Sequence, residues 1–282
     1  MLCFVIGKLE EPKTFAFVSD VVALLLRSVA AVCLDIDGTL TDGARGPAIP
    51  GVSAATRLLR AAFPVRLVTN TTSVPHAALA RHLLGLGLLE DPASLLTPAT
   101  VAARVLPERG HDAGILIVEP GARADYAWFR EDPDGPAVVL ATEAHDFRVA
   151  DLQPAFRRLL DGAAFYTLQR NRYFRRGDAL VTDLGPLAAF FTYASGVEAE
   201  TLGKPSPLLF DAVAAECGVA REEILMAGDD AEFDVAASVR LGMVGALVRT
   251  GKYREGDETR VSPAPTLVVK SVAELPERLG IA

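Results

Sequence analysis

The stretch Ala31-Val-Cys-Leu-Asp35-Ile-Asp37-Gly38-Thr39 decides how the chain is expected to fold. An apolar run leads directly into Asp35, a second carboxylate follows at Asp37, and Gly38 lets the backbone turn sharply behind it. A short apolar run without alternation is typical of a strand buried on both faces of a parallel sheet. Ligands bind beyond the carboxyl ends of such strands, so this stretch predicts a strand that brings two acidic side chains to a binding site.

The chain repeats this pattern of a short apolar run followed by polar residues. Residues 65–68 lead into Thr69, and residues 224–227 lead toward Asp229. Segments with helical spacing of their apolar residues lie between these runs, each shortly after a proline: 56–62, 79–84 and 208–214. The alternation predicts an α/β protein with a Rossmann-like parallel sheet. If the strands are neighbours, Asp35, Thr69 and Asp229 share one pocket.

A second, smaller α/β unit is expected within the chain. Residues 115–180 carry strand signals of their own at 115–118, 137–140 and 163–168. We therefore predict three parts: an N-terminal extension at 1–28, a catalytic core at 29–74 and 199–282, and an inserted α/β cap domain at 75–198.

Composition argues against several classes of function. The 282 residues are 50% hydrophobic, which is ample for a buried core, and the formal net charge of −8 leaves no basic excess for binding nucleic acid. Cys3, Cys33 and Cys217 are far apart and form no CxxC pair, so they indicate neither a disulfide framework nor a zinc site. A reducing, cytoplasmic location fits this pattern best. The sequence leaves open whether the chain forms a homo-oligomer.

The apolar residues among the first 28 need a separate interpretation. Charged residues interrupt them: Lys8, Glu10, Glu11, Lys13 and Asp20. No apolar run therefore approaches the roughly 20 residues of a membrane-spanning helix, and we expect no membrane partner. We expect either a terminal helix packed on the surface or a poorly ordered extension. Because recognisable motifs begin only after Val29, and valine codons can start translation in bacteria, we also hypothesise that the natural chain starts later than Met1.

The closeness of Asp35 and Asp37 requires a counter-charge. At an effective dielectric of about 20, two like charges about 4 Å apart repel by about 4 kcal/mol, so a cation or a proton has to intervene. Oxygen ligands from carboxylates, a phosphate group and retained waters suit Mg²⁺ better than zinc. The pair therefore predicts a magnesium site that also binds a phosphate oxygen.

Asp35-Ile-Asp37-Gly38-Thr39 at the end of an apolar strand resembles the first motif of the haloacid dehalogenase-like (HAD) superfamily of phosphatases. The other motifs follow in order: Thr69-Asn70, Gly203-Lys204-Pro205, and Gly228-Asp229-Asp230 with Asp234. Three further stretches are similar to subfamily IIA, which has a large C2-type α/β cap: Ile49-Pro50-Gly51, Thr69-Asn70-Thr71-Thr72 and Thr250-Gly251-Lys252-Tyr253. That subfamily includes NagD-like phosphatases and phosphatases of the phospholysine phosphohistidine inorganic pyrophosphate type.

The resemblance implies a catalytic role for several of these residues. Asp35 would be the nucleophile that forms an aspartyl-phosphate, and Asp37 would be the general acid and then the general base. Lys204 would offset the negative charge of the reacting groups. Thr69, through its hydroxyl, and Asn70, through its backbone N–H, would hold phosphate oxygens.

The resemblance also implies the ligands of the metal. The carboxylates of Asp35 and Asp229 and the backbone carbonyl of Asp37 would bind Mg²⁺, and Asp234 would orient the metal or a bound water. Whether Asp230 or Asp234 ligates directly is left open. The expected function is Mg²⁺-dependent hydrolysis of a small phosphorylated metabolite, of pyrophosphate or of a phospho-amino acid.

Substrate choice is expected to lie in the cap. Gln169, Arg170 and Asn171 follow the predicted strand at 163–168, where the resemblance implies a substrate-facing loop, although polar loops at strand ends are common. Two other functions fit the same motifs. A phosphotransferase or mutase would use the same Asp35 with an acceptor other than water, and a catalytically silent protein would bind a phosphorylated metabolite without turnover.

Overall fold

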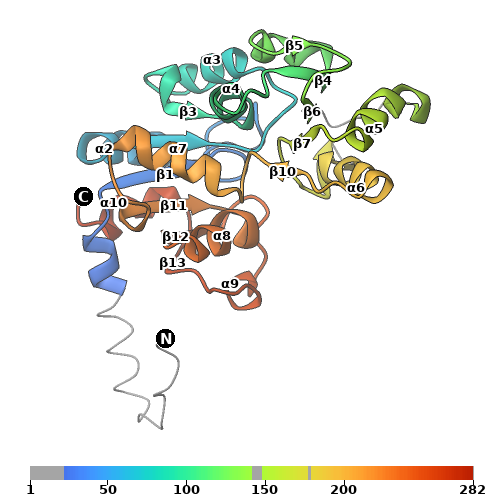
Figure 1. The fold of residues 1–282 in the computed structure, drawn as a ribbon. Helices are drawn as coiled ribbons and strands as arrows, with labels where there is room; N and C mark the ends of the chain where they lie inside the picture. Colours follow the sequence, from blue (N-terminus) through green and yellow to red (C-terminus); the bar gives the residue numbers. More distant parts are fainter. Residues whose placement is uncertain (1–21, 142–147, 177–178, 282) are drawn as a thin grey trace.

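The computed structural model describes residues 22–141, 148–176 and 179–281. They form two parallel sheets, each covered by helices, and one antiparallel hairpin (Figure 1). This architecture confirms the predicted α/β class. Residues 22–27 are helical, whereas the expectations for residues 1–21 lie outside the described part of the chain. Within the described ranges, no helix has both the length and the apolar character needed to span a bilayer.

The larger sheet contains the strands that carry the acidic motifs. Its six strands are all parallel and run in the order β13-β12-β11-β1-β2-β3. They are β1 (Ala31–Asp35), β2 (Val65–Val68), β3 (Leu95–Leu96), β11 (Ile224–Gly228), β12 (Val244–Val248) and β13 (Leu267–Val269). The three strands expected from the sequence are thus neighbours, in the order β11-β1-β2. Their carboxyl ends lie together, because Leu34 is in register with Ala227 and Asp35 with Val68.

Alternate residues of β1 face two different cores. The helices of this part are α2 (Val52–Ala62), α3 (His76–Gly85), α7 (Pro207–Cys217), α8 (Ala237–Arg240), α9 (Asp257–Arg260) and α10 (Leu275–Arg278). Val32 and Leu34 pack with residues of α2, α3 and α10, whereas Ala31 and Cys33 pack with residues of α7. All four side chains are fully buried, which explains why the apolar run shows no alternation.

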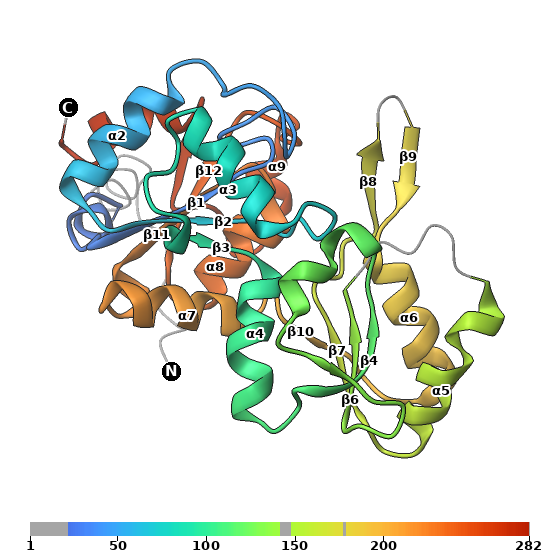
Figure 2. The same cartoon turned by 90° about the horizontal axis from the view of Figure 1, so that it is seen from above.

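The smaller sheet has five parallel strands in the order β10-β7-β6-β4-β5. They are β4 (Ala113–Ile117), β5 (Arg130–Glu131), β6 (Ala137–Leu140), β7 (Ala164–Thr167) and β10 (Glu200–Thr201). Helix α4 (Pro98–Glu108) covers one face, and α5 (Gln153–Leu160) and α6 (Leu184–Ser195) cover the other (Figure 2). An antiparallel hairpin of β8 (Tyr173–Arg176) and β9 (Ala179–Thr182) projects from this sheet.

The structure moves two of the predicted domain boundaries. The sequence assigns residue 75 onward to the cap, yet β3 pairs with β2 in the larger sheet, and α3 contributes Leu79 and Leu83 to the core beneath it. The sequence also assigns residue 199 onward to the core, yet β10 pairs with β7 in the smaller sheet. The chain thus joins the smaller sheet after β3 and leaves it after β10. Two-residue strands carry too little periodicity to reveal this.

Local signals place Lys204 between β10 and α7. The Ser206 hydroxyl accepts a hydrogen bond from the backbone N–H of Leu208, so Ser206 caps the helix. Pro207 occupies the first helical position, where no N–H is needed, and Gly218 ends the helix in the left-handed conformation. The start of α7 is therefore fixed just beyond the lysine.

Candidate active site

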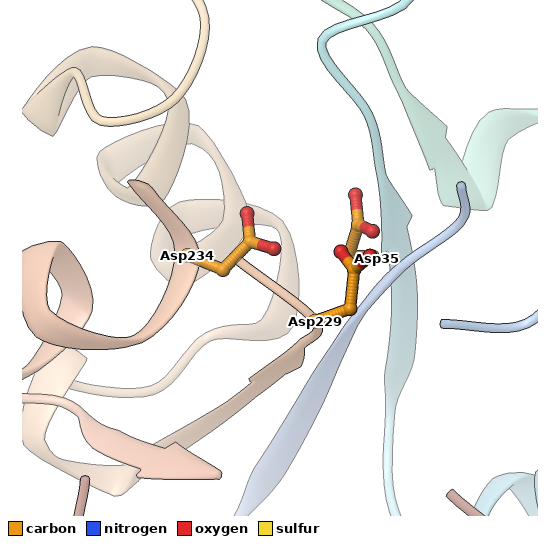
Figure 3. Close-up of side chains that lie close together, drawn as sticks. All are labelled: Asp35, Asp229 and Asp234. Atoms are coloured by element: carbon orange, nitrogen blue, oxygen red, sulfur yellow. The ribbon is translucent and has the colours of Figure 1, made fainter. Parts of the chain in front are cut away.

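Three buried carboxylates meet at the carboxyl end of the larger sheet (Figure 3). Asp35 ends β1, Asp229 directly follows β11, and Asp234 lies in the following π-helical turn, η5 (Ala231–Ala236). One carboxylate oxygen of each residue lies within 4.8 Å of those of the other two. The pairing of β1 with β11 is what brings these distant segments together.

Lys204 supplies a positive charge to this cluster. Its ammonium pairs with Oδ1 of Asp35 and, at 2.8 Å, with Oδ1 of Asp234. The lysine is only 4% exposed. Burial lowers the pKa of Lys204, but the two carboxylates more than compensate, so its pKa lies above the ordinary value and the ammonium stays charged.

One ammonium leaves the three carboxylates with an excess of negative charge. Burial, together with the charges of Asp35 and Asp234, raises the pKa of Asp229 to about 8. Burial raises the pKa of Asp234 to about 7, against the opposing effect of Lys204. A set of hard oxygen donors with surplus negative charge is the environment that Mg²⁺ prefers. The residues present therefore fit a magnesium ion.

Two glycines allow the backbone to approach Asp229 closely. Gly38 has φ +83°, and a Cβ there would lie 2.1 Å from Oδ2 of Asp229. Gly251 has φ +58°, and a Cβ there would lie 2.0 Å from the same oxygen. The backbone N–H of Lys252 donates a hydrogen bond of 2.6 Å to Oδ2 as well. The glycine of the first motif is thus required by contact as well as by conformation.

Asp37 lies beside the cluster with only one carboxylate oxygen bonded. The Thr71 hydroxyl donates to Oδ2 over 2.7 Å, whereas Oδ1 is buried and has no hydrogen-bond partner among the described residues. Burial raises the pKa of Asp37 above its ordinary value, although the bond from Thr71 and the charge of Lys204 oppose this. A raised pKa and a free oxygen are properties that a general acid needs.

The second motif contacts the lysine in a way that the sequence did not predict. The Asn70 side chain donates to the backbone carbonyl of Lys204 and accepts from its N–H. The Thr69 hydroxyl is buried, accepts from the N–H of Thr71 and donates to the Thr71 hydroxyl. The phosphate contacts predicted for Thr69 and for the Asn70 N–H stay predictions.

Asp230 and Asp234 have different surroundings. Oδ1 of Asp230 accepts from the N–H groups of Glu232 and Phe233 and so caps the turn that follows β11. Its Oδ2 lies 3.4 Å from the ammonium of Lys252. Asp234, by contrast, faces the other two acids of the cluster. The geometry therefore favours Asp234 over Asp230 near a metal.

The predicted substrate loop follows β7 in the smaller sheet. Gln169 is buried and donates to Asp183, and it accepts from the N–H of Asn171. Arg170 is exposed. Burial raises the pKa of Asp183, and the hydrogen bonds from the Leu184 N–H and the Gln169 side chain oppose this. Substrate contact by these three residues stays a prediction.

Two hydroxyl groups of the site have roles that sequence analysis missed. Thr39 donates to Oδ2 of Asp35 over 3.1 Å, and Thr71 donates to Asp37. Both lie in stretches that resemble family motifs, which is the signal that could have drawn attention to them. Their direction depends on loop conformation, which a motif does not give.

The fold and the site define a class of enzyme, and comparison with known proteins agrees. Residues 32–127 match the family described as haloacid dehalogenase-like hydrolase, and residues 201–275 match the family described as HAD-hydrolase-like. The human haloacid dehalogenase-like hydrolase domain-containing protein 2 is 36% identical over 247 residues, covering 87% of this chain and 93% of that protein. The chain therefore belongs to the haloacid dehalogenase-like hydrolase family.

Another relative and two solved structures are also similar to this chain. The human phospholysine phosphohistidine inorganic pyrophosphate phosphatase is 35% identical over 239 residues, covering 83% of this chain and 87% of that protein. The 4-nitrophenylphosphatase of Thermotoga maritima superposes with a TM-score of 0.81 at 24% identity, covering 90% of this chain and 98% of that one. The glycerol phosphate phosphatase of Mycobacterium tuberculosis, in complex with magnesium, gives 0.77 at 21% identity, covering 89% and 78%.

These likenesses confirm three predictions. The family is that of the predicted resemblance, and the architecture is the predicted parallel-sheet core with an α/β cap. The enzyme class is that of a phosphatase-type hydrolase. At identities below 25%, the two solved structures support the shared fold alone.

Proposed function

We propose that this chain is a Mg²⁺-dependent phosphatase that hydrolyses a small phosphorylated metabolite through an aspartyl-phosphate on Asp35. The observation that carries the proposal is the position of Asp35. It lies against the Lys204 ammonium, and its carboxylate oxygen is within 4.8 Å of those of Asp229 and Asp234. A buried carboxylate held among charged groups, at the ligand-binding end of a parallel sheet, is placed to attack a bound phosphoryl group.

The nucleophile needs no activating base. A carboxylate oxygen can attack directly, unlike a serine hydroxyl, which first has to give up its proton. In the first step an oxygen of Asp35 attacks phosphorus, and the bond from phosphorus to the leaving oxygen breaks. In the second step water attacks phosphorus, and the bond from phosphorus to the Asp35 oxygen breaks.

Asp37 moves the proton in both steps. Its carboxyl proton passes to the leaving oxygen in the first step. The resulting carboxylate takes a proton from the attacking water in the second step, which restores the starting enzyme. Such general acid–base catalysis typically contributes about 10² to 10⁴ in rate. The burial of Asp37, which raises its pKa, supports this assignment.

Charge and hydrogen bonds hold the phosphoryl group. Lys204 pairs with Asp35, while Thr69 and Asn70 directly follow the end of β2. Positioning and charge stabilisation account for most of the catalysis of phosphoryl transfer. We assign phosphate binding to these three residues.

The magnesium ligands are assigned from the same cluster. The carboxylates of Asp35 and Asp229 and the backbone carbonyl of Asp37 would hold the ion, with Asp234 beside it. When bound, the ion neutralises negative charge and polarises a phosphate oxygen. The excess of three carboxylates over one ammonium supports the assignment, as does the magnesium complex of the Mycobacterium tuberculosis phosphatase of the same fold.

The proposed substrate class is a small phosphorylated metabolite. The relatives and structural neighbours are named for phospholysine, phosphohistidine, inorganic pyrophosphate, 4-nitrophenyl phosphate and glycerol phosphate. All are small phosphoryl compounds, and we assign their selection to Gln169, Arg170 and Asn171 in the smaller domain. The cytoplasmic location expected from the cysteines stays a prediction.

Phosphate release tests the proposal. Wild type should release inorganic phosphate from 4-nitrophenyl phosphate with Mg²⁺ and should stop when a chelator is added. Asp35→Asn should abolish release while the variant still folds, as a cooperative thermal unfolding transition would show. The matched control is Asp211→Asn, because Asp211 is a half-exposed partner of Arg221 away from the site, and this variant should behave as wild type. Release that persists in Asp35→Asn or in chelator would contradict the proposal, and binding without release would favour a silent phosphometabolite-binding protein.

A further inference from the structure

Thr71 connects the end of β2 with Asp37 through a chain of hydrogen bonds. The Thr71 N–H donates to the Thr69 hydroxyl over 3.0 Å, and the Thr69 hydroxyl donates to that of Thr71 over 3.0 Å. The Thr71 hydroxyl then donates to Oδ2 of Asp37 over 2.7 Å. Each group in this chain thus donates toward Asp37, and Oδ2 of Asp37 is the last acceptor.

The other oxygen of Asp37 is left free. Oδ1 is buried and has no hydrogen-bond partner among the described residues. Buried carboxylate oxygens without partners are rare because they forgo the free energy of a hydrogen bond. Such an atom beside Asp35 is best explained by a partner that arrives with the substrate.

We propose that Thr71 is a positioning residue that reserves Oδ1 of Asp37 for proton transfer. The inference rests on the proposed function, in which Asp37 is the general acid and base. Because Oδ2 accepts the Thr71 proton, the carboxyl proton is carried on Oδ1. It passes from Oδ1 to the leaving oxygen as the bond to phosphorus breaks, and Oδ1 takes a proton back from the attacking water.

The hydroxyl also limits rotation of the carboxyl group. The χ2 torsion of an aspartate is broad and roughly two-fold, so without a fixed partner either oxygen can face the substrate. The 2.7 Å hydrogen bond from the Thr71 hydroxyl to Oδ2 supplies that partner and favours the orientation in which Oδ1 stays free. Removing the Thr71 hydroxyl should leave Asp35 in place and let the carboxyl group of Asp37 rotate.

Three substitutions in one loop separate this role from a structural one. Thr71→Val removes the hydroxyl with little change in shape, and Thr71→Ser keeps it. Ser73→Ala is the matched control, because Ser73 lies in the same loop and is exposed. Thermal unfolding midpoints identify any variant that fails to fold.

The leaving group provides the decisive measurement. Protonation matters most for an alkyl phosphate, whose alkoxide is a poor leaving group, and least for 4-nitrophenyl phosphate, whose phenolate leaves unaided. The ratio kcat/KM reports the barrier from free enzyme and substrate to the first irreversible transition state, and hence the acid step. Thr71→Val should lower kcat/KM for glycerol phosphate by about 10- to 100-fold and that for 4-nitrophenyl phosphate by less than about 3-fold. Thr71→Ser should restore most of the loss, and Ser73→Ala should lose nothing.

Each outcome decides between the two proposals. An equal loss on both substrates, or the same loss in Ser73→Ala, would make Thr71 structural and overturn the inference. The inference would also be overturned if Asp37→Asn lowered kcat/KM selectively for glycerol phosphate and Thr71→Val left it unchanged. If Asp35→Asn or Asp37→Asn hydrolysed both substrates at the wild-type rate, the proposed function itself would fail.

Discussion

The side chain of Asn70 and the backbone of Lys204 form a reciprocal pair of hydrogen bonds. Nδ2 of Asn70 donates to the Lys204 carbonyl over 2.8 Å, and the Lys204 N–H donates to Oδ1 of Asn70 over 2.7 Å. The pair joins the end of β2 to the segment before α7. It fixes the backbone from which the Lys204 ammonium reaches Asp35, so Asn70 acts on the charge of the site indirectly.

Asn70→Asp should therefore reduce activity through Lys204. The new carboxylate replaces the Nδ2 donor with an acceptor that faces the Lys204 carbonyl, so an attraction becomes a repulsion. We expect the free energy of unfolding to fall by about 1–3 kcal/mol, with kcat/KM for 4-nitrophenyl phosphate reduced about 10- to 100-fold. Chemical denaturation and steady-state kinetics measure the two effects. If the free energy of unfolding and kcat/KM both kept their wild-type values, the two hydrogen bonds between Asn70 and Lys204 would not position the lysine.

Gly251→Ala should disrupt the metal site through Asp229. Its Cβ would overlap Oδ2 of Asp229, and displacement of a reacting or ligating group by about 1 Å can cost about 10²-fold in rate. Gly110→Ala is the control, because Gly110 also has a positive φ, +71°, but its Cβ would meet no described atom within 4 Å. Both variants should lose about 1 kcal/mol of stability through the backbone, and Gly251→Ala should lose more because its Cβ would also lie 2.5 Å from the Cα of Gly38. Only Gly251→Ala should lose activity, and equal activities would contradict the overlap.

The stability of the metal-free protein should fall as pH rises. The pKa values of Asp229 and Asp234 are raised from 3.8 to about 8 and about 7, so the folded state binds more protons than the unfolded state between these limits. The stabilisation that these two protonated carboxyl groups contribute is then fully present near pH 4 and is lost toward pH 8. Mg²⁺ should raise the unfolding midpoint more at pH 8 than at pH 5, because at pH 5 protons compete for the same oxygens. Thermal melts in chelator and in Mg²⁺ test this, and an equal Mg²⁺ effect at both pH values would count against it.

Lys204→Met should destabilise the protein more at high pH than at low pH. The substitution leaves the carboxylates of Asp35 and Asp234 buried without their cation, which typically costs about 3–5 kcal/mol. The pKa of Asp234 is raised to about 7, so at pH 5 this group carries a proton and the loss should shrink. Lys270→Met is the control, because the Lys270 side chain is 89% exposed and its loss should change stability by less than about 0.5 kcal/mol. Denaturation in chelator at both pH values gives the comparison, and a pH-independent loss would contradict the charge argument.

Fully buried strands could be predicted from the sequence. Ala137–Leu140 forms a strand at the predicted residues, and Ala31–Asp35 contains the predicted apolar run, because every strand position beneath covering helices favours an apolar side chain. The two-residue strand β3 was missed, since Leu95–Leu96 is too short to show a period. The placement of residues 75–96 with the larger sheet depends on that strand, so the domain boundary was missed with it.

The site was predictable where a backbone motif fixes the side chain. The convergence of Asp35, Asp229 and Lys204 follows from strand order and motif order, and the structure brings them together. The bonds of Asn70 and Thr71 could not be predicted, because each depends on how a loop beyond β2 turns toward a segment far away in sequence. Patterns along a chain give the ends of strands but not the direction of side chains in the loops that follow.

Chemical trapping of the intermediate tests the central claim most directly. Enzyme quenched during turnover of 4-nitrophenyl phosphate with Mg²⁺ would be reduced with borohydride, which converts an aspartyl-phosphate to homoserine, and the peptides would be sequenced by mass spectrometry. The account predicts homoserine at position 35 in wild type and none in enzyme treated without substrate. Homoserine at another aspartate, or none at position 35 while phosphate is being released, would contradict it.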